Sequence, residues 1–267
     1  METKLALNLE LDKTQLYWKQ RARANWLRHG DQNSAFFHHF PSQRKRRNRI
    51  LFLNSDQGIR MESEMDIHTV ARDYFMDIFS SIHPDNFEQI LASVSPCIST
   101  AENDILMSPF DKKEVYTTLQ AMGPLKAAGA DGLGEVFYQR LWHILGDEVA
   151  DFCIGLLNGV YDMQLINQTH TVLIPKVSSP SNMTHYRPIS LCNVIFKIAS
   201  KMLANRLQKF LDICIDESQS AFIPGRAITD NVMIAYDILH SFTRNRMVRK
   251  GYFALKLDMS KAYDHVE

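Results

Sequence analysis

The sequence has few cysteines, no long apolar run and no net charge, and each shortage excludes a class of protein. Its 267 residues include four cysteines, and no two of them have the spacing of a zinc site. Scattered thiols of this kind are typical of an intracellular protein whose cysteines stay reduced and mostly buried. Because no apolar run reaches about 18 residues, we expect no transmembrane helix. The charged N-terminus is unlike a secretory signal, so we expect a nuclear or cytoplasmic protein without a membrane contact.

The zero net charge conceals an uneven distribution along the chain. Eleven cations between Lys13 and Arg60 stand against two acidic residues, whereas eleven acidic residues between Met61 and Gln120 stand against three cations. A basic segment followed by an acidic one indicates either an intramolecular pairing or a contact with nucleic acid.

The basic segment also contains aromatic residues, among them Trp18 and Trp26. Cations mixed with aromatics favour nucleic-acid binding through phosphate neutralisation and base stacking. Amphipathic helices with buried aromatics and solvated cations explain the same pattern, and the residues do not decide between the two. The candidate nucleic-acid ligands are the consecutive cations Arg44, Lys45, Arg46 and Arg47.

Hydrophobic spacing and turn residues predict a helix-rich α+β protein. We place a basic helical segment in residues 1–80, a linker in 81–110 and a second domain in 111–267. Expected helices cover residues 13–28, 33 onward, 65–79, 111–122, 135–145, 147–161, 193–214 and 227–245. Expected strands cover residues 50–53, which begin a hairpin, 171–176 and 253–258, and a loop is expected at 180–188.

The two C-terminal helices have apolar positions at helical spacing. In the helix at 193–214 we expect an apolar face and place Lys197 away from it. In the helix at 227–245 we expect a buried face. The residues of the first face are Val194, Ile198, Met202, Leu207 and Leu211, and those of the second are Val232, Ile234, Ala235, Ile238 and Leu239.

The last expected strand ends at Asp258. A carboxylate at the end of an apolar strand suits a divalent metal ion, which prefers hard oxygen ligands. Two-metal phosphoryl transfer needs several such carboxylates close together, and one strand supplies only one or two. A cap for a following helix is an equally good explanation of Asp258 from spacing alone.

Two cations and two turn-like segments indicate little when each is taken alone. Lys176 closes the expected strand at 171–176, and Arg187 follows in the next loop; two such cations suit a triphosphate, although both could equally be solvated surface residues. The segments Gly129–Gly132 and Gln219–Arg226 have the composition of turns.

In chain order, these segments resemble the reverse transcriptases of LINE-type (non-LTR) retrotransposons, especially those of the plant lineage. The resemblance covers nearly the whole chain from about Lys13. The matching runs are Trp26–Asn33 with Phe36–His38, Lys126–Leu133, Leu173–Lys176, Tyr186–Asn193, Lys201–Leu207, Gln219–Arg226, Asp230–Asn231 and Lys256–Val266.

The resemblance implies the fingers and first palm strand of a right-hand polymerase fold, together with a basic segment before the fingers. It implies that Asp258 is a catalytic ligand of Mg²⁺ and that Tyr263 blocks a ribose 2′-OH. Its implied partners are an RNA template, a DNA primer and a deoxynucleoside triphosphate (dNTP). The implied dNTP-binding residues are Lys176, Arg187, Met259, Lys261, Ala262 and Tyr263, and the implied residues near the template are Gln219, Gly225 and Arg226.

The chain also departs from the family pattern. No Asp-Asp pair, which carries the second palm motif of the family, occurs anywhere in it. Ala128 and Ala130 replace prolines that are usual around Gly129, which loosens a stiff turn. We therefore expect a truncated reverse transcriptase that is inactive alone and would need the missing palm and thumb. The alternatives are a nucleic-acid-binding fragment without catalysis and an unfolded product of a decayed element.

Overall fold

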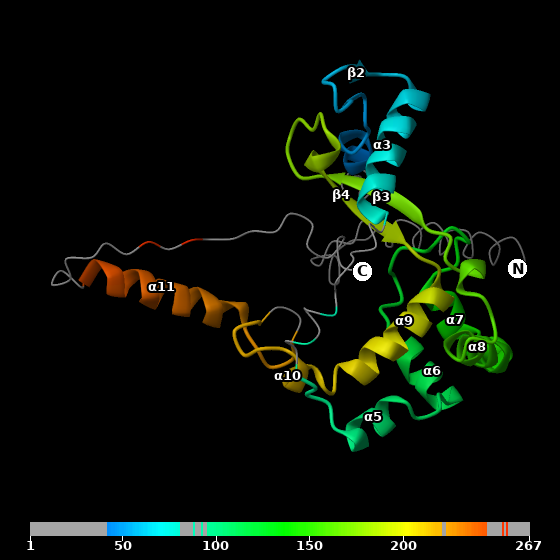
Figure 1. Cartoon of the computed structure of the whole chain (residues 1–267). Helices are drawn as coiled ribbons and strands as arrows, with labels where there is room; N and C mark the ends of the chain where they lie inside the picture. Colours follow the sequence, from blue (N-terminus) through cyan, green and yellow to red (C-terminus); the bar gives the residue numbers. More distant parts are fainter. Residues whose placement is uncertain are drawn as a thin grey trace, which may run out of the picture. The chain divides into compact units, whose positions relative to one another are not determined.

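A computed structural model describes residues 42–80, 88, 92, 95–220, 223–244, 253 and 255 (Figure 1). The chain divides into two compact units, one of Met1–Phe75 with Phe110–Ser200 and one of Met76–Pro109 with Lys201–Glu267. The helices expected at 13–28 and from residue 33 lie outside the described residues. Of the strand expected at 253–258, only Phe253 and Leu255 are described, and neither has strand conformation.

The first unit contains a small hairpin of β1 (Leu53–Asn54) and β2 (Arg60–Met61). The strands are antiparallel, with Leu53 opposite Met61. Gly58 in the turn has φ of 77°, a left-handed conformation that favours glycine. The hairpin expected in this region is thus confirmed, with shorter strands.

A second hairpin is formed by β3 (His170–Pro175) and β4 (Tyr186–Leu191). These strands are antiparallel, with His170 opposite Leu191 and Pro175 opposite Tyr186. The strand expected at 171–176 is confirmed. The prediction of a loop at 180–188 is wrong for its last residues, because Tyr186 is buried and its strand pairs with β3. A short 3-10 helix, Met183–His185, leads into β4.

Helix α3 (Glu64–Phe79) packs against this second hairpin through residues between Ile67 and Phe75. It begins after Ser63, whose Oγ accepts a hydrogen bond from the backbone N–H of Asp66 at 3.1 Å. The small core beneath α3 centres on Leu53, Met183 and Tyr186, and Leu173 joins them from β3. The contacting α3 residues are Ile67, Val70, Ala71, Tyr74 and Phe75. The helix expected at 65–79 is confirmed, and it gives β3–β4 one covered face.

The rest of the first unit is helical, with α6 (Lys112–Gln120), α7 (Glu135–Arg140), α8 (Trp142–Leu157) and the first half of α9 (Val194–Leu207). Asp111 caps α6, because its Oδ1 accepts a hydrogen bond from Glu114 N–H at 2.7 Å. The most deeply buried apolar side chains of this part belong to Val115, Leu119, Ala150, Cys153, Val194, Ile198 and Ala199.

Two helix boundaries differ from the predicted ones. The break expected near Gly146 lies at Leu141 instead. Gly146 is inside α8, where a Cβ would come within 2.7 Å of the Trp142 ring. The long helix expected at 193–214 ends at Leu207, and a short α10 (Leu211–Cys214) follows. The chain turns between them with Phe210 buried, so burial of that ring replaces a continuous helix.

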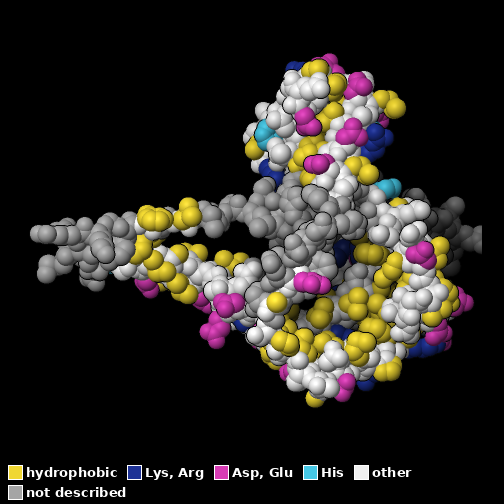
Figure 2. All heavy atoms as spheres, in the orientation of Figure 1, with side chains coloured by type: hydrophobic (Ala, Val, Ile, Leu, Met, Phe, Trp, Pro, Cys, Tyr) yellow, Lys and Arg dark blue, Asp and Glu magenta, His cyan; other side chains and the backbone are white. Residues whose placement is uncertain are grey.

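The second unit contains α5 (Thr100–Leu106), α10 and α11 (Ile228–Arg244). Helix α5 lies in the stretch expected to be a linker and begins with a reciprocal capping box between Ser99 and Glu102. The helix expected at 227–245 is confirmed as α11, but the prediction that its apolar face is buried is wrong. Val232 is 61% exposed and Ile238 49% exposed. Figure 2 shows apolar side chains along this helix. Spacing predicts which face is apolar, not whether another element covers it.

Candidate functional site

The β3–β4 hairpin presents two cations on its uncovered face, that is, the exposed face turned away from the core beneath α3. Ile174 lies opposite Arg187, and Lys176 follows Ile174 by two residues, so strand alternation puts the Lys176 and Arg187 side chains on the same face. The Lys176 N–H extends the ladder by donating to the carbonyl of His185 at 2.8 Å. Both side chains are exposed. A guanidinium fork beside an ammonium point charge can bind the oxygens of a polyphosphate.

The Lys176 ammonium donates to the backbone carbonyl of Thr184 at 3.0 Å. This contact holds the lysine across the end of the hairpin, where the segment 177–185 connects the strands. The apolar neighbours on the same face, Val172 and Ile189, are partly exposed. The uncovered face therefore combines two cations with an apolar surface.

The opposite face of the hairpin is structural. Leu173 and Tyr186 point into the core beneath α3. Burial raises the pKa of the Tyr186 phenol, so this group stays neutral. Strand alternation gives the hairpin two different faces. One face packs beneath α3, and the other stays exposed and can bind a ligand.

A hollow of about 460 Å³ lies between the β1–β2 turn, α3 and the segment before β4. Its lining includes Asp56, Asp73 and Tyr74, together with Asn182 and Thr184. Two carboxylates repel a phosphate group, so this hollow is a poor nucleotide site. The uncovered face of β3–β4 is the better candidate.

The loop at 126–133 is fastened to the junction between β4 and α9. The turn predicted at Gly129–Gly132 is confirmed, with the Gly132 N–H donating to the Gly129 carbonyl at 3.2 Å and a Gly132 φ of 73°. A Cβ on Gly129 would lie 2.4 Å from the backbone nitrogen of Asn193. Only glycine permits this close approach. The turn thus forms without the prolines that Ala128 and Ala130 replace.

A buried ion pair lies under the same loop. The Lys197 ammonium donates to Glu135 Oε1 at 3.1 Å and to the Ala127 carbonyl at 2.7 Å. The Glu135 side chain is fully buried, and among the described residues its Oε2 has no hydrogen-bond partner. The prediction that Lys197 points away from the packed side of its helix is wrong, because the lysine joins α9 to α7 and the loop.

Sequence reasoning did not select Glu135 or Lys197. The available signal was a charged residue within the apolar stretch that starts α9, where Lys197 stands between Phe196 and Ile198. A buried charge at such a position needs a partner of opposite charge. The spacing does not indicate which of many acidic residues supplies it.

The loop predicted to lie near a template is held by its own arginine. The Arg226 guanidinium donates to the carbonyls of Asp216 at 2.6 Å, Gln219 at 2.8 Å and Ile215 at 3.2 Å. Gly225 in the turn before it has φ of 80°. Hydrogen bonds from Ser218 lower the pKa of Asp216, with a smaller contribution from the charge of Arg226. Template contacts by Gln219, Gly225 and Arg226 stay predictions, and a phosphate would compete with these carbonyls for the arginine.

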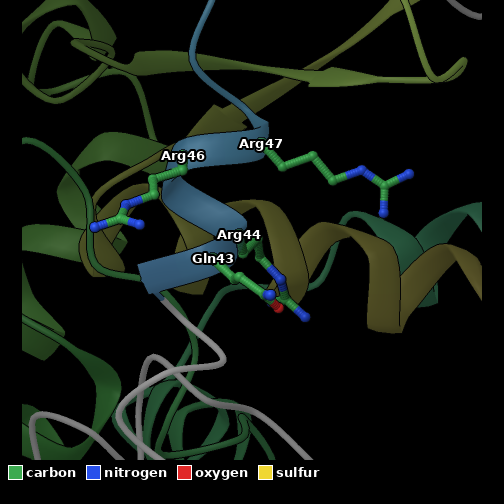
Figure 3. A pocket seen from close by; sticks show the side chains of 4 residues that line it. All are labelled: Gln43, Arg44, Arg46 and Arg47. Atoms are coloured by element: carbon green, nitrogen blue, oxygen red, sulfur yellow. The ribbon is translucent and has the colours of Figure 1, made fainter.

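The basic cluster at 44–47 is on a short helical turn. All four cations, Arg44, Lys45, Arg46 and Arg47, are exposed. Gln43 and the three arginines line a hollow, with Arg46 and Arg47 extending in opposite directions (Figure 3). Fanned guanidinium groups can reach several phosphates of a backbone at once.

The predicted metal and sugar contacts lie outside the described residues. They comprise Asp258, Met259, Lys261, Ala262 and Tyr263. Within the described ranges, no three or more His, Cys, Asp or Glu side chains are grouped to hold a metal ion. Likewise, no described helix has the length and apolar character needed to cross a membrane.

Residues 174–267 match the family of reverse transcriptases (RNA-dependent DNA polymerases). The match starts in β3 and includes Lys176, Arg187 and Asp258. It covers the part of the chain that contains the candidate phosphate-binding face.

Proteins of transposable elements are similar over larger parts of the chain. A protein of transposon TX1 from Xenopus laevis, an uncharacterized 149 kDa protein, is 31% identical over 252 residues, which are 92% of this chain and 19% of that protein. The Pol polyprotein of the type-1 element R2 from Nasonia vitripennis is 31% identical over 53% of this chain and 13% of its own length. That of the type-2 element R2DM from Drosophila melanogaster is 34% identical over 37% of this chain and 9% of its own.

The chain spans less than a fifth of the length of these relatives, 19% in the most extensive match. The similarities support a reverse transcriptase of the non-LTR retrotransposon kind.

Proposed function

We propose that this chain supplies the fingers and first palm strand of the RNA-directed DNA polymerase of a LINE-type element. The observation that carries the proposal is the pair of exposed cations, Lys176 and Arg187, on the uncovered face of β3–β4. This hairpin begins the region that matches reverse transcriptases. The runs quoted from the sequence favour a plant lineage, and the relatives named above come from animals.

In this proposal Lys176 and Arg187 bind the phosphates of the incoming dNTP. Asp258 contributes one carboxylate toward Mg²⁺, and Tyr263 excludes a ribose 2′-OH. Residues 259–262 border the triphosphate, with Met259, Lys261 and Ala262 on that segment. The template is RNA and the primer is DNA. Magnesium, when bound, neutralises phosphate charge and orients the attacking and leaving oxygens.

The binding role of the two cations is tested by titrating the chain with a fluorescent dNTP. Arg187→Ala and Lys176→Ala should each weaken binding roughly ten- to a hundredfold, since charge-assisted hydrogen bonds contribute about 1.5–3 kcal/mol. Arg140→Ala and Lys113→Ala are matched controls, because both cations are exposed on helices of the same unit. Equal affinity of all four variants would remove the phosphate role of the hairpin.

Nucleic-acid binding without catalysis is a second candidate function. It is favoured by the exposed cations at 44–47, three of which line one hollow. Binding to a single-stranded RNA should weaken as salt rises, by about 0.7 log unit of affinity per log unit of salt for each phosphate contact. The triple variant Arg44→Ala, Arg46→Ala, Arg47→Ala should flatten this dependence. A slope that is flat already in the unaltered protein speaks against a nucleic-acid site.

A further inference from the structure

Two thiols that are 117 residues apart in the sequence face each other in the second unit. Cys97 Sγ lies 3.7 Å from Cys214 Sγ. Both side chains are exposed, whereas Cys153 is buried and Cys192 is partly buried. The expectation of mostly buried thiols is therefore wrong for this pair. Exposure matters because a thiol must meet an oxidant in solution before it can react.

The segment that follows Cys97 is fastened at two points. Two residues beyond Cys97, the Ser99–Glu102 capping box fixes the start of α5. Beyond α5, the Arg206 guanidinium donates to the carbonyls of Leu106 at 3.0 Å and Pro109 at 3.1 Å. These contacts attach the segment to the end of α9, close in sequence to α10.

Cys214 is fastened in a similar way. It is the last residue of α10, and its N–H donates to the Phe210 carbonyl at 3.2 Å. The residues immediately after it, Ile215 and Asp216, offer their carbonyls to Arg226. Since both thiols are attached to hydrogen-bonded elements of one unit, their proximity is built into the fold of that unit.

We propose that Cys97 and Cys214 are a reversible redox pair that forms a disulfide with a low-molecular-weight disulfide as the oxidant. Forming the bond requires the two sulfurs to move from 3.7 Å to about 2.05 Å apart. We expect rotation of the two exposed side chains to provide this movement. A metal site is a poorer use of the pair, because no third ligand is grouped with it among the described residues.

The chemistry is an exchange in two steps. The thiolate of one cysteine attacks a sulfur of glutathione disulfide, which forms a mixed disulfide and releases one glutathione thiolate. The second cysteine, after losing its proton to solvent, attacks the protein sulfur of the mixed disulfide and displaces the second glutathione. Two protein thiols are oxidised and one glutathione disulfide is reduced to two glutathione molecules, so electrons and atoms balance.

The cross-link would join the segment before α5 to the end of α10. Because Cys214 immediately precedes the loop at 215–226, the cross-link would anchor the start of that loop. Desolvation is the main cause that raises the pKa of the Cys214 thiol, and the neighbouring Cys97 thiol and Glu102 charge add to it. The exchange is therefore best followed at about pH 8, where more thiolate is present.

The test uses the whole purified chain incubated with mixtures of reduced and oxidised glutathione, followed by alkylation and peptide mass spectrometry. We expect two of the four thiols to be lost together and a linked peptide that contains Cys97 and Cys214. Cys153 should stay unalkylated in the folded protein under both conditions, because burial raises its pKa to about 12. It thereby reports that the chain is folded.

Two variants make the outcome decisive. Cys97→Ser should abolish the linked peptide and leave glutathione attached to Cys214, because the resolving thiol is gone. Cys192→Ser should form the link as the unaltered chain does. The proposal is overturned if the folded chain carries only glutathione adducts, if Cys192 takes part in the link, or if Cys97→Ser oxidises to the same extent without adduct.

Discussion

At the scale of single residues, the pair of Lys197 and Glu135 adds little net stability, but losing either partner is costly. Glu135 is fully buried, whereas 23% of the Lys197 side chain remains exposed. A buried pair offers modest net stability, yet removal of one partner leaves an uncompensated charge. The pair also satisfies the Ala127 carbonyl, and in this way it positions the loop beside the start of α9.

We predict that Lys197→Met costs about 3 kcal/mol of unfolding free energy, because the Glu135 carboxylate stays buried without its partner. The double variant Glu135→Met, Lys197→Met should cost clearly less than the sum of the two single variants. Urea unfolding measures all three. Additive costs would show that the two side chains do not interact.

The control for this prediction is a surface cluster of one lysine and two aspartates in the same unit. Lys112 contacts Asp147 at 2.9 Å and Asp151 at 3.0 Å, and hydrogen bonds to these carboxylates raise its pKa, that to Asp147 most. All three side chains are largely exposed, so Lys112→Met should change stability by no more than about 1 kcal/mol. An effect as large as that of Lys197→Met would contradict the burial argument.

At the scale of elements, the loop between α6 and α7 contacts the backbone where β4 leads into α9. Gly129 touches the backbone at Cys192 and Asn193, just after β4 ends. Asn193 in turn donates to the Ile166 carbonyl and accepts from the Phe196 N–H. Three segments that are distant in sequence therefore converge on one asparagine, and a glycine makes room for them.

Gly129→Ala should destabilise the protein by about 1–3 kcal/mol, because the new methyl group overlaps backbone atoms that cannot rotate away. Gly123→Ala in the same connection is the matched control. Its Cβ would approach only the Lys126 side chain, at 3.6 Å, so a change within about 0.5 kcal/mol is expected. Urea midpoints of the two variants should therefore differ. Similar midpoints would mean that the loop separates from Asn193 at little cost.

At the scale of the whole molecule, the number of carboxylates expected to bind metal limits the phosphoryl transfer that we expect of this chain. The chain offers Asp258 but no pair of adjacent aspartates. Two-metal phosphoryl transfer depends on positioned charge, so a single carboxylate loses the clamp on the reacting oxygens. On the proposed function, the 267-residue chain would therefore bind dNTP without polymerising DNA.

We predict that the purified chain does not extend a DNA primer on an RNA template with Mg²⁺ and dNTPs. The product should stay at the background level of the Asp258→Ala variant. Magnesium-dependent extension that this variant abolishes would overturn the prediction of an inactive chain. The same result would strengthen the assignment of Asp258.

Local sequence signals predicted an element wherever local interactions dominate the conformational energy of its segment. The cap at Asp111, the hairpin glycine at 58 and the helix of α11 follow from local hydrogen bonding and backbone freedom, which need no distant partner. The pattern left both cations of β3–β4 open to a surface role, and the family resemblance assigned them to phosphate binding. The break in the helix at 193–214 was missed, because burial of Phe210 outweighed helical spacing.

By itself, the sequence determined the local elements and the resemblance to reverse transcriptases, since both reside in short runs of residues. Only the tertiary structure decided that Lys197 meets Glu135, that Gly129 touches Asn193 and that Cys97 faces Cys214. It also decided that the apolar face of α11 remains exposed among the described residues. Such pairings join residues far apart in the chain, and their energy depends on packing that no local pattern encodes.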